Sequence, residues 1–363
     1  MQGGFSLLKA FLFLLLAGVS FANLFVYAII LISYLPIKYL SYNYVHYNSK
    51  HIAVIAAHNE ETVISDTIHN LLKAGFDYIF ILLDNCTDNT KSIIMKLKQN
   101  YYMRINFFED NLRSKTKILS KYLNYIASKF DNNDYIYVFD ADNRVQEDFL
   151  RLSKQYDYDF VQFRIKVIQN NIFAAIYKYL YSFFIALQIG FNKLGLSAVF
   201  GGAGMRFKVN ALKQYPFKCD TLTDDLEYSY KVPFVYFIPD AFVINEVPES
   251  FITMLKQFTR WIKGNIQNVI RINKNHKHIT AIIILFLLNA FLLPFYITHI
   301  FYPANILFFL LFAIIISFRS IENIPYLPAI YILSIFFVIP YYNAIITFKN
   351  KNWFKTPKKG VQI

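Results

Sequence analysis

The chain has 363 residues, of which 56% are hydrophobic and 17% charged, and its mean hydropathy is +0.33. This composition excludes an ordinary soluble domain and favours a protein that is partly embedded in a membrane. The formal net charge of +13 could suit a nucleic-acid binder, but lysines and arginines lie beside the hydrophobic runs, so we expect no nucleic-acid partner.

The first hydrophobic run extends from residue 5 to residue 35 and contains a single charge, Lys9. It exceeds the roughly 20 apolar residues that cross the hydrocarbon core of a bilayer. A cleaved signal peptide is the alternative, but the run is too long for such a peptide and no small-residue cleavage site precedes a polar mature start. Residues 1–49 are therefore predicted to form a transmembrane anchor and its linker.

Basic residues follow this first run and precede a second apolar block. They are Lys38, Lys50, Lys256, Lys263, Arg271, Lys274 and Lys277. This positive-inside pattern predicts a multi-pass integral membrane protein whose soluble domain lies in the cytoplasm beside membrane lipid, at the plasma membrane if the source is prokaryotic. The two cysteines, Cys86 and Cys219, suit a reducing compartment and supply no disulfide or metal framework.

Between the hydrophobic ends, short β-rich runs alternate with amphipathic helical stretches. Strands are predicted at His51–Ala57, Tyr78–Asp84, Arg104–Phe108 and Tyr135–Asp140. The alternation indicates an α/β domain with a mostly parallel sheet over residues 50–250, in which ligands bind beyond the carboxyl ends of the strands. The apolar, tyrosine-containing stretch 171–191 is predicted to be a helix, either at the membrane interface or buried in the core.

Three of these strands lead directly into polar residues, which begin at His58, Asp84 and Asp140. Asp140 and Asp142 can bring two carboxylates to one ion, and hard oxygen ligands of this kind suit Mg2+ or Mn2+. An exposed acidic turn would explain a lone Asp-x-Asp equally well. In the middle motif, we interpret Asp84 as the functional group and Asp88 as a helix cap.

A second acidic motif, Thr223-Asp224-Asp225, begins a predicted helix. Two adjacent carboxylates raise the pKa of each other when they lie close together, which favours a general base. By itself the motif also fits an acidic helix N-terminus that interacts with the helix dipole.

Residues 251–278 form a basic amphipathic stretch that is predicted to be an interfacial helix. On such a helix Gln257, Arg260 and Trp261 share one face. An arginine suits a diphosphate and an indole can stack on a sugar ring, whereas the alternative is an interfacial tryptophan beside a snorkelling arginine.

Together, and in this order, the motifs resemble those of the inverting family 2 glycosyltransferases, particularly the membrane-integrated branch that contains cellulose, chitin and hyaluronan synthases. The resemblance covers about residues 50–270 and the C-terminal tail. The segment from Ala57 to Glu61 looks like the Pro-x-x-Asn-Glu motif of the family, with Ala56 in place of proline, and Asp224 replaces the glutamate of its Thr-Glu-Asp motif.

The resemblance implies a GT-A-type fold, a hexosyltransferase-type reaction with inversion, and a nucleotide-sugar donor, expected to be a UDP-sugar. It implies that Asp225 is the general base, that Arg260 stabilises the leaving diphosphate, and that Asp140 and Asp142 hold the metal. The donor-binding positions would be His58, Asn59, Glu60, Asp84, Lys115, Asp140, Arg260, Thr356 and Lys358. The acceptor-binding positions would be Gly202, Gly204, Gln257 and Trp261.

Two of these assignments depart from the family pattern or lie far from the other motifs. The segment that ends at Lys115 looks like Arg-x-Gly-Lys with the glycine lost. In the basic tail, residues 348–363, Trp353, Thr356 and Lys358 resemble a gating segment that closes over the nucleotide, and a lysine-rich membrane-surface tail is the alternative.

Three apolar runs, at residues 279–301, 304–318 and 327–347, precede that tail. If the tail and the catalytic domain are both cytoplasmic, the number of spans between them is even, so one run should lie at the interface or re-enter. We expect a glycan or lipid-linked acceptor in exopolysaccharide or cell-envelope glycan synthesis, and the sequence does not decide between single transfer and polymerisation. The alternative is a non-catalytic membrane scaffold that keeps the fold, but a scaffold has no reason to retain carboxylates at every motif.

Overall fold

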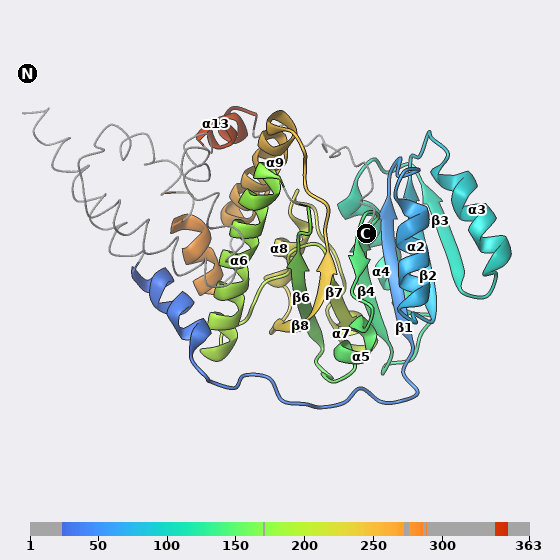
Figure 1. Ribbon diagram of the computed structural model, residues 1–363, viewed down its shortest axis with the longest axis horizontal. Helices are drawn as coiled ribbons and strands as arrows, with labels where there is room; N and C mark the ends of the chain where they lie inside the picture. The colour runs from blue at the N-terminus through green and yellow to red at the C-terminus, as the bar shows by residue number, and fades with distance from the viewer. Residues whose placement is uncertain (1–23, 170, 272–275, 286–287, 289–337, 348–363) are drawn as a thin grey trace, which may run out of the picture.

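The computed structural model describes residues 24–169, 171–271, 276–285, 288 and 338–347. Within these residues, an eight-stranded sheet has the order β3-β2-β1-β4-β7-β6-β8-β5. Helices lie on both sides of the sheet, and α6 and α9 lie next to each other beside its second half (Figure 1).

The first half of the sheet consists of parallel strands joined by helices. Its elements are β1 (His51–Ala57), α2 (Ile64–Lys73), β2 (Tyr78–Asp84), α3 (Thr90–Asn100), β3 (Ile105–Asp110), α4 (Lys115–Ala127) and β4 (Tyr135–Asp140). β1 pairs in parallel with β2 and β4, and β2 pairs in parallel with β3. Three predicted strands have the predicted bounds, and the one predicted at 104–108 lies at 105–110.

The second half of the sheet is mixed. Its elements are β5 (Arg144–Val145), α5 (Phe149–Ser153), β6 (Phe160–Lys166), α6 (Ile172–Lys193), β7 (Met205–Lys208), α7 (Val209–Gln214), α8 (Asp224–Ser229), β8 (Tyr236–Ile244), α9 (Phe251–Ile270) and α13 (Val338–Ile346). β7 is antiparallel to both β4 and β6, β5 is antiparallel to β8, and β6 is parallel to β8. The prediction of a mostly parallel sheet therefore holds for β1–β4 and is wrong for the second half. The reason is that β7 begins beside the carboxyl end of β4 and runs in the opposite direction to it.

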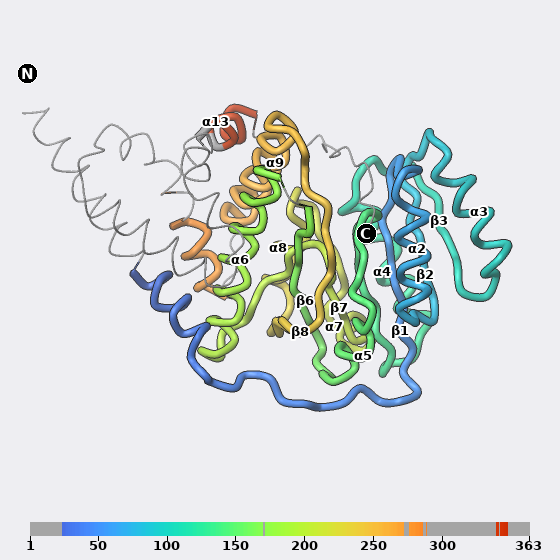
Figure 2. Tube along the Cα trace, in the orientation of Figure 1, coloured from blue at the N-terminus to red at the C-terminus, as the bar shows by residue number. Residues whose placement is uncertain are grey.

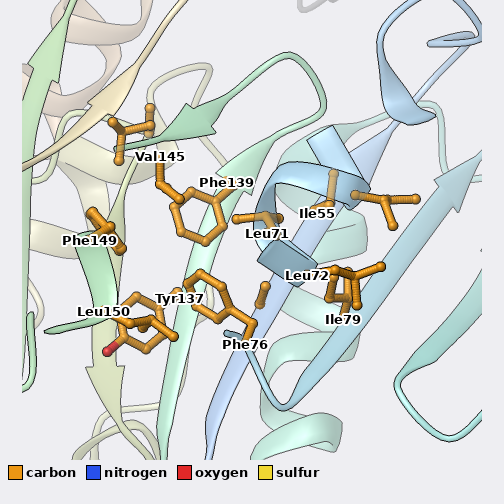
Figure 3. Packing of buried hydrophobic residues seen from close by; sticks show 14 of the residues in the cluster. Ile55, Leu71, Leu72, Phe76, Ile79, Tyr137, Phe139, Val145, Phe149 and Leu150 are labelled. Carbon is orange, nitrogen blue, oxygen red and sulfur yellow. The ribbon is translucent and has the colours of Figure 1, made fainter. Parts of the chain in front are cut away.

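The two faces of the parallel strands are buried against different helices. Odd-numbered residues such as Ile55 and Phe139 pack with α2, α3 and α5, and Figure 3 shows this cluster. Even-numbered residues such as Val54 and Val138 pack with α4, α7 and α8. Because successive side chains of a strand point to opposite faces, burial on both sides explains why these strands read as nearly continuous apolar runs.

An apolar helix, Leu24–Tyr34, packs against α6 beside the sheet, and the following linker then runs along the sheet to β1 (Figure 2). A Cβ atom at Gly190 of α6 would lie 2.3 Å from the carbonyl oxygen of Ile29, so the two helices approach closely there. Among the described residues, α6 is the one helix long and apolar enough to cross a membrane, and 61% of its most apolar window is buried. That burial favours the core-helix alternative for residues 171–191.

The C-terminal elements are described only in part. α13 packs against α9, where Ala344 contacts Ile262. Most of the apolar block 279–347, the first 23 residues and the tail with Thr356 and Lys358 lie outside the described residues. The predicted domain boundaries and the even number of spans stay predictions.

Candidate active site

The register of the parallel strands brings three predicted motifs to one edge of the sheet. Ala57 pairs with Leu83, and Ala56 pairs with Asp140. The residues that follow β1, β2 and β4 therefore meet at the carboxyl edge, as the sequence predicted.

The loop after β1 is braced against the loop after β2. His58 Nδ1 lies 2.7 Å from the carbonyl oxygen of Asp84, and Asn59 Oδ1 accepts a hydrogen bond from the backbone nitrogen of Thr87 at 2.7 Å. Asn59 and Asn85 have φ of 55° and 52°, in the left-handed region, which asparagine adopts more readily than most residues other than glycine.

Asp84 is buried and holds the loop that precedes α4. Its carboxylate accepts hydrogen bonds from the backbone nitrogens of Leu112 and Arg113, each at 2.8 Å, and of Ser114 at 2.6 Å. Arg113 has a φ of 51°, a conformation that glycine adopts without strain. The structure thus shows Asp84 positioning the turn that leads to Lys115, and its contact with the nucleotide stays a prediction.

Beside that loop, the N-cap residue of α3 is Asn89, so Asp88 lies one residue before the predicted capping position. Asp88 still contacts the start of the helix, because its Oδ1 accepts from the backbone nitrogen of Thr90, the first residue of α3, at 3.0 Å.

Lys115 reaches across the edge of the sheet and forms an ion pair with Asp140. Burial alone would lower the pKa of Lys115, but the carboxylates of Asp140 and Asp224 outweigh it, so the pKa is raised. The lysine is therefore a permanent cation between the Asp-x-Asp turn and the second acidic motif.

The turn after β4 carries Asp140 and Asp142, the two carboxylates that the sequence predicted to hold a metal. Asp142 is buried, and the backbone nitrogen of Asp140 donates to Asn143 Oδ1 at 2.8 Å, which fixes the turn. Among the residues that the structure describes, no group of three or more His, Cys, Asp or Glu side chains could hold an ion. A pair of carboxylates still fits Mg2+, which is commonly held by one or two carboxylates together with substrate phosphates and water.

The second acidic motif begins α8, with Asp224 buried and Asp225 half-buried. Burial and the neighbouring Asp224 raise the pKa of Asp225 to about 7, against the opposing effects of the Leu226 backbone N–H, Lys115 and Arg260. A carboxyl group with a pKa near neutrality is suited to act as a general base.

α9 fixes the position of α8 through contacts that the sequence analysis missed. Asn268 Nδ2 donates to the Thr223 hydroxyl oxygen at 2.9 Å, and Gln267 Oε1 accepts from the Leu222 backbone nitrogen at 3.0 Å. A Cβ atom at Gly264 would lie 2.6 Å from Thr223 Oγ1. Gly264, Gln267 and Asn268 lie four, seven and eight residues after Arg260. This spacing places them on the same helix face as Arg260, and it was the signal in the sequence that could have indicated these contacts.

The predicted face of α9 lies against α6 and the acidic motif. Tyr177 of α6 donates its hydroxyl to Gln257 Oε1, and the ring of Trp261 meets that of Tyr177 edge-on at 6.0 Å. Burial raises the pKa of both Asp224 and Asp225, and Arg260 lies close enough to oppose part of that rise. Among the residues that the structure describes, the buried Nε of Arg260 has no hydrogen-bond partner. A buried guanidinium donor of this kind suits an anionic ligand.

The loop between α6 and β7, which contains Gly202 and Gly204, lies against Asp225. A Cβ atom at Gly202 would lie 3.2 Å from Asp225 Oδ2, and Gly202 has a φ of 84°. Gln162 clamps this loop, since its Oε1 accepts from the Gly201 nitrogen and its Nε2 donates to the Ala203 carbonyl, each at 2.8 Å. A Cβ atom at Gly204 would lie 2.5 Å from the side chain of Val243, so this glycine serves packing.

A carboxylate whose pKa is raised to about 7, two cations and an Asp-x-Asp turn lie around the carboxyl edge of this α/β sheet, an arrangement that suits a glycosyltransferase. Residues 135–343 match the model of Glycosyl transferase family group 2, and residues 52–214 match that of Glycosyl transferase family 2. The chain belongs to glycosyl transferase family group 2, which confirms the predicted family and enzyme class.

Curated relatives and a solved structure agree with this assignment. The poly-beta-1,6-N-acetyl-D-glucosamine synthases of Staphylococcus aureus (strain COL) and Staphylococcus epidermidis are 24% and 25% identical to the chain, over 60% of it. The chain spans about half the length of these relatives, 55% of each. The mannosyltransferase PcManGT from Pyrobaculum calidifontis, solved with GDP-Man and Mn2+, superposes with a TM-score of 0.67 at 16% identity, over 94% of this chain and 98% of that one. At that identity the likeness shows the fold alone, and it confirms a GT-A-like α/β architecture.

Proposed function

We propose that the chain transfers a sugar from a nucleotide-sugar donor to a glycan or lipid-linked acceptor in polysaccharide assembly, with inversion at the anomeric carbon. The observation that carries the proposal is Asp225, a carboxylate whose pKa is raised to about 7 beside the cations Lys115 and Arg260. A scaffold protein has no need for a carboxylate poised in this way.

In the proposed step, Asp225 removes the proton from an acceptor hydroxyl as its oxygen attacks the anomeric carbon. The bond from that carbon to the donor phosphate breaks, and the proton stays on Asp225. Lys115 and Arg260 face the negative charge that develops on the diphosphate, and such pre-positioned cations stabilise a transition state without reorganisation.

Asp140 and Asp142 are the residues that would hold Mg2+ or Mn2+, and the ion, when bound, would neutralise charge on the diphosphate. The support is the pair of oxygen ligands at the carboxyl edge, together with the Mn2+ in the PcManGT structure of the same fold. His58, Asn59, Glu60 and the loop held by Asp84 would line the nucleotide.

We propose a UDP-sugar as the donor, with UDP-N-acetylglucosamine as the first candidate, because two curated relatives are named as synthases of an N-acetylglucosamine polymer. GDP-mannose is the second, since PcManGT was solved with it. Gly202 and Trp261 would contact the acceptor, with Gly204 and Gln257 holding the surrounding elements.

Membrane association belongs to the same proposal. Exposed apolar side chains on helix Leu24–Tyr34 and α13 support it, among them Phe25 at 64% and Ile346 at 82% exposure. Surfaces of this kind mark contact with lipid or protein. We place the chain in the membrane-integrated branch, multi-pass, with a cytoplasmic catalytic domain, and labelling a cysteine at Gln362 only from the outside of sealed membranes would contradict this topology.

For the tail, we propose that Thr356 and Lys358 close over the donor diphosphate. A chain that ends after Lys351 should then lose turnover, and unchanged turnover would leave the tail as a surface anchor.

The proposed function is tested by incubating membranes that contain the chain with radiolabelled UDP- and GDP-sugars. Label should enter lipid extract or polymer with one donor, and the variant Asp225→Asn should abolish the incorporation. No turnover with any donor would favour the scaffold alternative.

A further inference from the structure

Two tyrosines on α6 lie one helical turn apart and belong to the surroundings of the site. Tyr177 binds Gln257 of α9, and the ring of Tyr181 lies 6.2 Å from that of Tyr177. Residues four apart share a helix face, so α6 presents both phenols toward the same side. The family motifs include neither of them.

The Tyr181 hydroxyl is connected to the Asp-x-Asp turn by a chain of hydrogen bonds. Asn245, the residue after β8, donates its Nδ2 to the Tyr181 hydroxyl at 3.3 Å, and its Oδ1 accepts from Asn143 Nδ2 at 3.0 Å. Asn143 in turn accepts from the backbone nitrogen of Asp140 at 2.8 Å. Three segments that are distant in sequence therefore fix the phenol relative to the turn.

This arrangement leaves the Tyr181 hydroxyl with a proton to donate. The oxygen accepts from Asn245, and in the described part of the chain the hydroxyl has no other hydrogen-bond partner. Burial, followed by the negative charges of Asp140, Asp142 and Asp225, raises the pKa of Tyr181. The phenol is therefore neutral, and its O–H lies near both the metal-binding turn and the base.

We propose that Tyr181 is an acceptor-binding residue that donates its hydroxyl proton in a hydrogen bond to the acceptor sugar and holds that sugar beside Asp225. The proposal rests on the glycosyl transfer proposed above. The chain leaves α6 directly into the loop that places Gly202 against Asp225. Lys115 and Arg260 already supply the charge that a diphosphate needs, whereas a neutral donor suits a sugar hydroxyl.

The variant Tyr181→Phe tests this assignment because it removes the hydroxyl and keeps the ring. With UDP-N-acetylglucosamine as donor and a β-1,6-linked N-acetylglucosamine pentasaccharide as acceptor, the KM for the pentasaccharide should rise about five- to tenfold, the loss expected for one neutral hydrogen bond. The Kd for UDP in the presence of Mn2+, the hydrolysis of donor without acceptor and the unfolding temperature should stay unchanged. A purely structural role would not separate these quantities.

The matched control is Tyr158→Phe. Its hydroxyl accepts from the backbone nitrogen of Ser41 at 2.9 Å, and Tyr158 precedes β6, at the end of the strand remote from the carboxyl edge. This variant should keep the wild-type KM for the pentasaccharide.

The possible outcomes distinguish an error in the proposed function from an error in the role of Tyr181. Absence of transfer by the unmodified chain from every UDP- and GDP-sugar of the donor panel would overturn the proposed function and this assignment with it. Transfer with an unchanged KM for the pentasaccharide in Tyr181→Phe, or a weakened Kd for UDP instead, would overturn only the role of Tyr181.

Discussion

The two halves of the sheet hold their functional groups in different ways. In the parallel half, strand register and backbone amides fix the groups, as the three amides that bind Asp84 show. In the second half, Asp225 and Arg260 lie on separate helices, and side-chain contacts such as that of Asn268 with Thr223 set their mutual position.

This difference in how the groups are held should have different consequences for donor binding and for turnover. A site framed by the sheet resists small displacements, because moving it requires breaking ladder hydrogen bonds. Helices that meet through a few side chains can shift by fractions of an ångström at lower cost, and catalysis is sensitive to such shifts. We expect changes in the first half to affect donor affinity and changes at the contact of α8 with α9 to affect kcat.

The largest effect is expected at the base. Asp225→Asn should lower kcat by about 10²- to 10⁴-fold, the usual contribution of general base catalysis. The Kd for UDP should change little, because the base acts on the acceptor. Turnover within a few-fold of wild type would show that another group accepts the proton.

On the donor side, Asp142→Asn should weaken UDP binding in Mn2+ by about tenfold or more, because it removes one of two proposed metal ligands. Activity should also disappear in EDTA. Full activity in chelator, with the metal content checked, would remove the ion from Asp140 and Asp142.

The interface of α8 and α9 is probed by Gly264→Ala. The added Cβ would meet both the side chain and the backbone nitrogen of Thr223, the latter at 2.8 Å, so α8 must shift. We expect kcat to fall roughly tenfold with the Kd for UDP nearly unchanged. Asn265→Ala, one residue along the same helix, is the control, and an equal loss there would show that helix stability and not the contact is responsible.

The smallest effect concerns pH. A general base must be deprotonated to accept a proton. The pH profile of kcat/KM should therefore have an acid limb that rises with pH and has its midpoint near 7, the pKa of Asp225. Asp224 contributes to the raised pKa of Asp225, so Asp224→Asn should move that limb to lower pH. A limb that stays in place would show that burial alone sets the pKa.

The sequence was sufficient for the features that a local pattern encodes. Strands such as Tyr78–Asp84 have two buried faces, and the polar residues at their ends mark the carboxyl edge. The direction of β7 had no local signal, because it depends on where the chain returns after α6. The contacts of Gly264, Asn268 and Tyr181 likewise join residues far apart in sequence, and burial, the largest cause of the raised pKa of Asp225, arises only in the folded chain.

The close approach of Gly190 to Ile29 makes the N-terminal helix part of the frame of the site. Lys193, at the end of α6, donates to the carbonyl oxygen of Ser33 at 2.8 Å, so α6 and the helix Leu24–Tyr34 are held at more than one point. The same α6 carries Tyr177 and Tyr181. Removing the residues before residue 36 to obtain a water-soluble enzyme would therefore expose the side of α6 that packs against the helix Leu24–Tyr34. The detergent or lipid that then covers this side of α6 would become a variable in every kinetic assay.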